Sequence, residues 1–194
     1  MLKWLCRIYI RMTIKRIKHC MTLDLSKAVG IAENALRILP SSPSLHNQLG
    51  FLYLEAGMEE VSLFHSKKAM ILLGKKNERF EPWMNTGVAY IHIAWPQIAI
   101  QCFDKAEKLR DQVNMVEYGK LLIFRAEARR DVIKRRLTNN PAEQISFALQ
   151  DLNAGEYMLM ECDNDTANFW IKQIPGRRKD IESLRDIRLT DVGG

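Results

Sequence analysis

The sequence is poor in the features that build β-structure and metal sites. Glycine accounts for only 10 of its 194 residues, and runs with the alternation of a β-strand are almost absent, so we expect an all-α protein. Its four cysteines, Cys6, Cys20, Cys102 and Cys162, form no CxxC pair, and its four histidines form no HExxH or similar cluster. These spacings predict free thiols in a reducing compartment and no bound metal.

Motifs of known catalytic chemistry are also missing. The sequence has no glycine-rich phosphate loop, no GxSxG turn and no cysteine with an obvious helper residue. Its carboxylates and histidines lie at spacings that do not bring them together on one face of a helix. We therefore expect a protein without enzymatic activity, catalytic residues or a cofactor.

Charge is absent from one long stretch. No charged side chain lies between Glu81 and Asp104, a distance sufficient to span a membrane. Trp95-Pro96 interrupts the run, because the residue before proline avoids the α region and proline cannot continue the preceding helix. Polar side chains interrupt it as well, at Asn85, Thr86, His92, Gln97 and Gln101. Residues 80–111 are therefore predicted to form a helical hairpin that turns at Trp95-Pro96.

Both halves of this hairpin repeat the same helical spacing. Positions i, i+4 and i+7 are occupied first by Trp83, Gly87 and Tyr90, and then by Ala99, Phe103 and Ala106. This order of residue types resembles the tetratricopeptide repeat, with Thr86 in place of the usual leucine and Asp111 in place of the closing proline. The resemblance implies that small residues let the two helices approach closely while aromatic side chains fill the wedge between them.

The same pattern recurs earlier in the chain. Residues 43–74 carry Leu49-Gly50, Tyr53 and Ala69 at matching positions, but Ser62 and Ser66 replace the small and aromatic residues of the second helix. Residues 26–40 match a second helix alone. Ala35, Ala69 and Ala106 are spaced at close to the 34 residues of the family. We expect a short, right-handed, tetratricopeptide-like solenoid of antiparallel helix pairs, flanked by N- and C-terminal helices.

This pattern divides the chain into four segments. They are a basic amphipathic helix at 1–25, the repeats at 26–111, a long basic helix with a capping helix at 112–160, and a charged tail with short helices at 161–194. Ser26 is the expected cap of the helix over 26–39. Within the last two segments we expect helices at 113–137, from Asn140 to about Leu152 or beyond, and at 178–189, with a turn at Pro175-Gly176 and frayed residues at 192–194.

Positive charge is concentrated in the two flanking helices. Residues 1–20 carry six basic and no acidic groups, and residues 120–137 carry seven basic and two acidic groups. The first helix is consistent with three roles: the first helix of an incomplete repeat, a membrane-surface helix or a targeting segment. In the second, the candidate phosphate contacts are Arg125, Arg129, Arg130, Lys134, Arg135 and Arg136, although a basic helix face is usually just solvated.

A second stripe on the first helices of the repeats supplies a candidate binding surface. It consists of Asn47, Phe51 and Leu54, followed one repeat later by Met84, Val88 and Ile91. The resemblance implies that these faces line a concave groove, and an apolar groove is normally covered. Either an amphipathic helix or extended peptide of a partner protein, or the chain's own C-terminal helix, would fill it.

These observations favour a non-enzymatic scaffold or adaptor that binds a partner segment within a multiprotein assembly. One alternative is a ribonucleoprotein component that contacts RNA through its basic helices. Another is a small repeat chaperone for a secreted protein, which rests on analogy of fold alone. The cysteines indicate an intracellular, cytoplasmic location, and the basic N-terminus leaves the mitochondrion as an alternative. Weak membrane-surface contact by residues 1–20 is a further expectation.

Overall fold

The computed structural model describes residues 2–186, and within them every regular element is a helix. The chain divides into two compact units, Met1–Ile93 and Ala94–Gly194. The division falls between the two helices of the hairpin predicted over 80–111. The last residues of the helix expected at 178–189, and the frayed end at 192–194, lie outside the described part of the chain.

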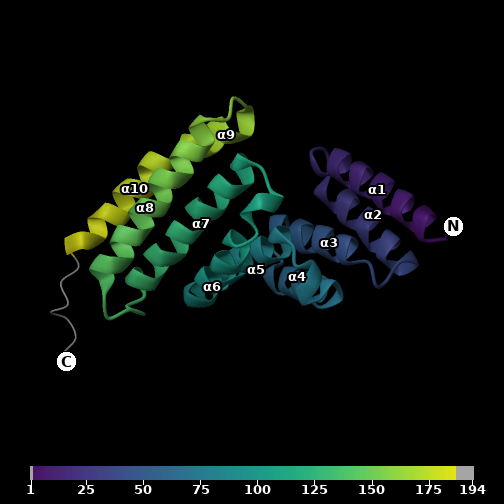
Figure 1. Cartoon of the computed structure of the whole chain (residues 1–194), viewed down its shortest axis with the longest axis horizontal. Coiled ribbons are helices and arrows are strands. Elements are labelled where there is room, and N and C mark those ends of the chain that lie inside the picture. The colour runs from purple at the N-terminus through teal and green to yellow at the C-terminus, as the bar shows by residue number, and fades with distance from the viewer. Residues whose placement is uncertain (1, 187–194) are drawn as a thin grey trace. The chain divides into compact units, whose positions relative to one another are not determined.

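The first unit contains five α-helices (Figure 1). They are α1 (Leu2–Met21), α2 (Leu25–Ile38), α3 (Pro43–Glu55), α4 (Glu59–Leu73) and α5 (Phe80–His92), with the short 3-10 helix η1 (Lys75–Asn77) before α5. Each helix packs against its neighbour in sequence. α1 contributes the buried side chains Ile17 and Cys20 to a core that also contains alanines of α2 and leucines of α3.

The second unit contains the remaining α-helices (Figure 1). They are α6 (Pro96–Glu107), α7 (Met115–Lys134), α8 (Pro141–Met160), α9 (Asp165–Ile171) and α10 (Ile174–Glu182), with the 3-10 helices η2 (Arg110–Gln112) and η3 (Ser183–Asp186). α7 and α8 form the most extensive pair, and α9 and α10 pack on α8. Ile123, Leu152 and Ile174 are fully buried in the core of this unit.

A glycine allows the close approach of α3 and α4. A β-carbon added to Gly50 would lie 2.3 Å from Ser66 Oγ and 3.3 Å from the Ser66 backbone nitrogen. The Ser62 hydroxyl donates a hydrogen bond of 2.6 Å to the Gly50 carbonyl. The two serines that depart from the repeat pattern therefore suit the contact with Gly50. Ser66 is small enough to lie against it, and Ser62 forms a hydrogen bond with its buried carbonyl.

Helices α7 and α8 also approach each other closely, at a contact between two glycines. A β-carbon on Gly119 would meet Leu159 Cγ at 3.0 Å, and one on Gly155 would meet the Gly119 carbonyl oxygen at 3.1 Å. The spacing of Tyr118, Gly119 and Leu122 matches the Leu-Gly-x-x-Tyr part of the repeat pattern, and Gly155 supplies the small residue opposite Gly119. The two helices expected at 113–137 and from Asn140 thus form a further helix pair.

Two local sequence expectations were wrong, and a third, the end of α8, was left open. Asp24, not Ser26, caps α2: its carboxylate accepts a hydrogen bond of 3.0 Å from the Lys27 backbone, where an acidic group also complements the helix dipole. Pro175-Gly176 is not a turn but the start of α10, because proline fits the first turn of a helix, where its missing N–H has no partner to lose. α8 continues through Gly155 to Met160.

We predict that two helical glycines of the first unit, Gly30 and Gly50, respond oppositely to alanine. Gly50→Ala should lower the free energy of unfolding by about 1–3 kcal/mol, because the added methyl overpacks the α3–α4 contact. Gly30→Ala should raise it by roughly 0.4–1 kcal/mol, since nothing lies within 4 Å of a β-carbon there. Chemical denaturation of both variants measures the difference.

Ser66→Ala provides the control for this prediction. Adding it to Gly50→Ala removes the hydroxyl that the new methyl would meet, so the double variant should recover part of the lost stability. Equal stability of Gly50→Ala and Gly30→Ala would contradict the close contact.

Candidate functional site

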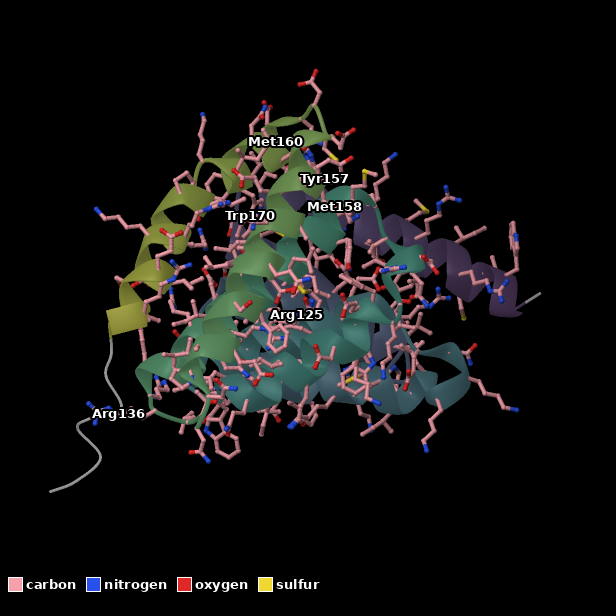
Figure 2. All side chains as sticks on the ribbon, turned by 60° about the vertical axis from the view of Figure 1, so that its left-hand side comes forward. Arg125, Arg136, Tyr157, Met158, Met160 and Trp170 are labelled. Carbon is pink, nitrogen blue, oxygen red and sulfur yellow. The ribbon has the colours of Figure 1, made fainter. Side chains whose placement is uncertain are left out.

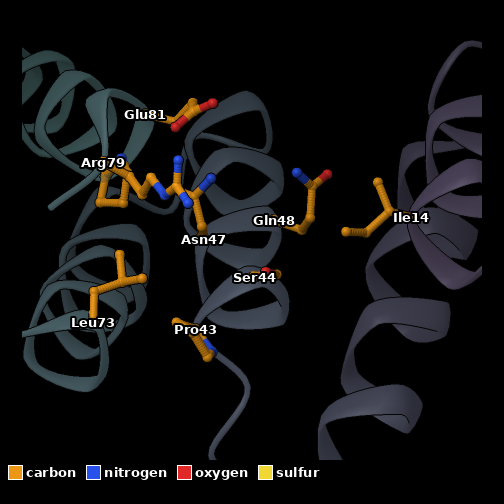
Figure 3. A pocket seen from close by; sticks show the side chains of 9 residues that line it. Ile14, Pro43, Ser44, Asn47, Gln48, Leu73, Arg79 and Glu81 are labelled. Atoms are coloured by element: carbon orange, nitrogen blue, oxygen red, sulfur yellow. The ribbon is translucent and has the colours of Figure 1, made fainter. Parts of the chain in front are cut away.

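A pocket in the first unit is the candidate binding site. It has a volume of about 350 Å³ and is lined by Ile14 of α1, Pro43, Ser44, Asn47 and Gln48 of α3, Leu73 of α4, Arg79, and Glu81 and Pro82 of α5. Gln48 and Ile14 extend toward each other from neighbouring helices, and Arg79 extends toward Asn47 (Figure 3). The lining combines amides, one cation and one anion with aliphatic walls, which suits a peptide better than a purely apolar ligand.

Asn47 is held in place by the next first helix along the chain. Asn85 Nδ2 donates hydrogen bonds to Asn47 Oδ1 at 3.1 Å and to the Asn47 carbonyl oxygen at 3.5 Å. Since the Asn47 side-chain oxygen is the acceptor, its Nδ2 group remains free to donate into the pocket. Pairing of the two asparagines therefore orients one amide as a fixed donor.

Arg79 precedes α5 and is exposed. Its guanidinium forms no ion pair with any other residue in the range 2–186, although Glu81 lines the same pocket. An arginine without a carboxylate partner beside a fixed amide donor can bind a carbonyl or carboxylate of a ligand.

The six groove residues predicted from the sequence occupy two environments. Leu54, Met84 and Val88 are buried, with 6–9% of their surface exposed, whereas Asn47, Phe51 and Ile91 are half-buried. Asn47 is the member that lines the pocket. Gln48, Arg79 and Ser44 were missed, because the repeat pattern draws attention to apolar faces and says little about polar side chains beside them.

The candidate phosphate contacts on α7 begin with a buried arginine. Arg125 is 7% exposed and binds Asp151 of α8 through its Nε at 3.0 Å and its Nη2 at 2.7 Å. Its Nη1 also bonds to Glu107 at 2.6 Å and Asp104 at 3.1 Å, both on α6. Burial acts to lower the pKa of Arg125, but the hydrogen bonds and charges of Asp151 and Glu107 outweigh it and raise that pKa.

Three further basic residues of α7 are paired inside the same unit. Arg129 bonds to Asp151 at 3.2 Å, Arg130 to Asp131 at 2.8 Å, and Lys134 to Asp180 at 2.8 Å. The hydrogen bond from Lys134 is the main cause of the lowered pKa of Asp180. Arg135 and Arg136 follow α7 and are exposed. Figure 2 labels the first and the last of the six residues, Arg125 and Arg136. Phosphate binding by the paired residues would have to break existing ion pairs.

Two of the histidines in the first unit, His46 and His65, form a hydrogen-bonded pair. His46 Nε2 lies 3.1 Å from the Pro40 carbonyl oxygen, which can only accept, so His46 is protonated at Nε2 and its Nδ1 accepts from His65 Nδ1 at 2.9 Å. The His65 ring stacks on Tyr53, whose hydroxyl donates to Glu33 at 2.6 Å. Within residues 2–186 no three His, Cys, Asp or Glu side chains are arranged to hold a metal ion.

Burial sets the protonation of this cluster. It lowers the pKa of His65 to about 4, helped by the neighbouring His46, and it also lowers the pKa of His46. Burial and the bond to Glu33 raise the pKa of Tyr53 to about 12. Both histidines are therefore neutral near pH 7.

The fold and the pocket define an all-α helical-repeat protein with a pocket lined by polar and aliphatic side chains. No protein-family model matches the sequence, and no curated protein matches it. Solved structures do match. The protein MamA is 13% identical over 95% of this chain and 96% of its own, with a TM-score of 0.56.

Two other solved structures extend this likeness. YrrB, described as a TPR protein with an unusual peptide-binding site, is 12% identical over 88% of this chain and 85% of its own, with a TM-score of 0.54. The TPR-like repeats of a kinesin light chain from Podospora anserina are 12% identical over 95% of this chain and 98% of theirs, with a TM-score of 0.57. At these identities the likeness concerns the fold, which is of the tetratricopeptide-repeat type. No helix among residues 2–186 is both long and apolar enough to cross a membrane.

The buried histidines predict an acid-sensitive first unit. Because their pKa values are lower in the folded chain than the 6.5 of an unfolded histidine, their neutral state favours folding above pH 6.5, and stability is lost as the pH falls from about 6.5 toward 4. His65→Gln should make this loss shallower, measured as the free energy of unfolding against pH. His19→Gln, at an exposed position, is the control, and an equal effect of both variants would contradict the buried pair.

The ion cluster predicts that Arg125 stabilises the second unit. Arg125→Met should lower the free energy of unfolding by about 3 kcal/mol, because it leaves the buried Asp151 with one of its two arginines. Adding Asp151→Leu should restore much of that stability, since an apolar pair can replace a buried ion pair. Arg135→Met is the exposed control, expected within about 0.5 kcal/mol of the parent. If both single variants melt alike, Arg125 is not a structural residue.

Proposed function

We propose that this protein is a non-enzymatic interaction scaffold that binds a segment of a partner protein in the pocket between α1, α3 and the start of α5. The observation that carries the proposal is the Asn47 amide, fixed by Asn85 with its Nδ2 donor directed to no described residue. A peptide backbone offers carbonyl acceptors at every residue, and a fixed donor binds one without losing further rotamer freedom.

The remaining pocket residues suit the same ligand. The Gln48 amide can pair with both a backbone N–H and a carbonyl, and Arg79 adds a charge-assisted donor. Ile14, Leu73 and Pro82 supply aliphatic walls for a side chain of the bound segment. This mixture favours an extended peptide with an acidic or carbonyl-rich stretch opposite Arg79.

The similarity to YrrB supports this proposal at the level of the fold. That protein is described as having an unusual peptide-binding site, so a repeat fold of this type can hold a peptide. The apolar residues Leu54, Met84 and Val88 are already covered in the chain, so a partner is expected to meet mainly the polar side of the groove.

The ion pairs of α7 argue against the alternative that this protein is a ribonucleoprotein component. Four of the six proposed phosphate contacts already bind carboxylates. RNA binding by those residues would have to compensate for the charge pairs that it breaks.

Peptide selection against the full chain tests the proposal. Peptides recovered from a random library are titrated into the parent protein and into Asn47→Ala. Loss of one hydrogen bond should weaken binding by about five- to tenfold, and Arg79→Ala should weaken the binding of acidic peptides further. Thermal unfolding confirms that each variant remains folded.

Asn153→Ala is the matched control, because Asn153 is an exposed asparagine on α8. It should leave the affinity unchanged. Peptides that bind Asn47→Ala and Arg79→Ala as tightly as the parent would refute the site, and a library without any binder would refute the proposed function.

A further inference from the structure

The outer surface of α1 carries apolar side chains that the fold does not use. Trp4, Ile8 and Met12 follow one another at i, i+4 and i+8 and are 63%, 36% and 68% exposed, and the adjacent Leu5 is 50% exposed. Residues four apart lie on the same side of a helix, so these side chains form one stripe along the first three turns. We refer to Trp4, Leu5, Ile8 and Met12 as the outer stripe.

The opposite side of α1 already provides its attachment to the protein. Thr13, Ile17 and Cys20 are buried, and the last two share a core with α2 and α3. The outer stripe is therefore not needed to hold α1 in place. The outer face of a terminal repeat is usually polar, so an apolar stripe there indicates a contact with something else.

Positive charge borders the outer stripe on both sides. At 100° per residue, Arg7, Arg11 and Lys18 lie on one side of the stripe, Arg16 lies on the other, and Lys15 continues it toward the end of the helix. All five are exposed. α1 contains no acidic residue at all.

We propose that α1 binds an anionic lipid surface, with the outer stripe inserted at the level of the headgroups and the flanking cations paired with lipid phosphates. A helix that lies in a membrane interface has this composition: aromatic and aliphatic side chains on one side, and lysine and arginine beside them. No residue of the outer stripe lines the peptide pocket, so this proposal does not depend on the proposed function.

Charge complementarity selects this occupant over a second copy of the chain. Joining two α1 helices along their outer stripes would bring together two sets of cations with no acidic residue to pair them. RNA would satisfy the cations, but its phosphates and sugars would leave Ile8, Met12 and Leu5 without apolar contacts. A bilayer interface supplies both anionic headgroups and acyl chains.

Vesicle co-sedimentation of the full chain tests the proposal. One set of vesicles contains phosphatidylcholine alone, and in the other phosphatidylserine replaces part of it. The parent protein should bind the anionic vesicles and not the neutral ones. Trp4→Asp combined with Met12→Asp should reduce binding by at least about tenfold, because two apolar anchors are replaced by charges that anionic lipid repels.

A second double variant separates insertion from general acidity. Phe64→Asp combined with Ile71→Asp makes the same chemical change at two exposed apolar positions of α4, which are 61% and 74% exposed. It should bind anionic vesicles like the parent. Arg7→Gln with Arg11→Gln should weaken binding and reduce its dependence on salt.

Three results would overturn the proposal. The first is equal binding of the parent and Trp4→Asp/Met12→Asp to anionic vesicles. The second is a dimer in lipid-free sedimentation that the same variant abolishes, which would make the outer stripe a contact between copies. The third is RNA that binds the parent and this variant equally well while preventing vesicle binding, which would assign the cations to nucleic acid.

Discussion

Close approach of helix backbones through residues with little or no side chain is the constraint on which this structure depends. Gly50 meets Ser66 in the first unit, and Gly119 meets Gly155 in the second. Leucines and isoleucines on both sides of such a contact are buried, whereas the remaining faces of the helices are polar or exposed. Added side-chain volume at these points is costly because cores packed at crystal density cannot absorb it.

The two units use their polar residues differently. In the first, asparagines of α3 and α5 pair and leave a donor in a pocket, while His46, His65, Tyr53 and Glu33 satisfy one another below the surface. In the second, basic side chains of α7 form ion pairs with carboxylates of α6, α8 and α10. Polar groups thus line a pocket in the first unit and join helices to one another in the second.

Much of the fold could be predicted from the sequence, because small residues and aromatics recur at helical spacing within short windows. The all-α class and the helices on both sides of Trp95-Pro96 follow from such local patterns. The environment of Arg125 could not be predicted, since its partners Glu107 and Asp151 lie 18 and 26 residues away. A run of basic residues has the same sequence pattern whether its side chains face solvent or buried carboxylates. The pocket around Asn47 could not be predicted either, because it combines residues from several helices.

The central claim is that Asn47 donates a hydrogen bond to a bound partner segment. The most direct measurement follows the side-chain NH₂ resonances of the asparagines in the nitrogen-15-labelled full chain while a selected peptide is added. The proposed function predicts that the Asn47 resonances shift in step with binding and that those of Asn153 stay in place. A peptide that binds while the Asn47 resonances remain unchanged would contradict it.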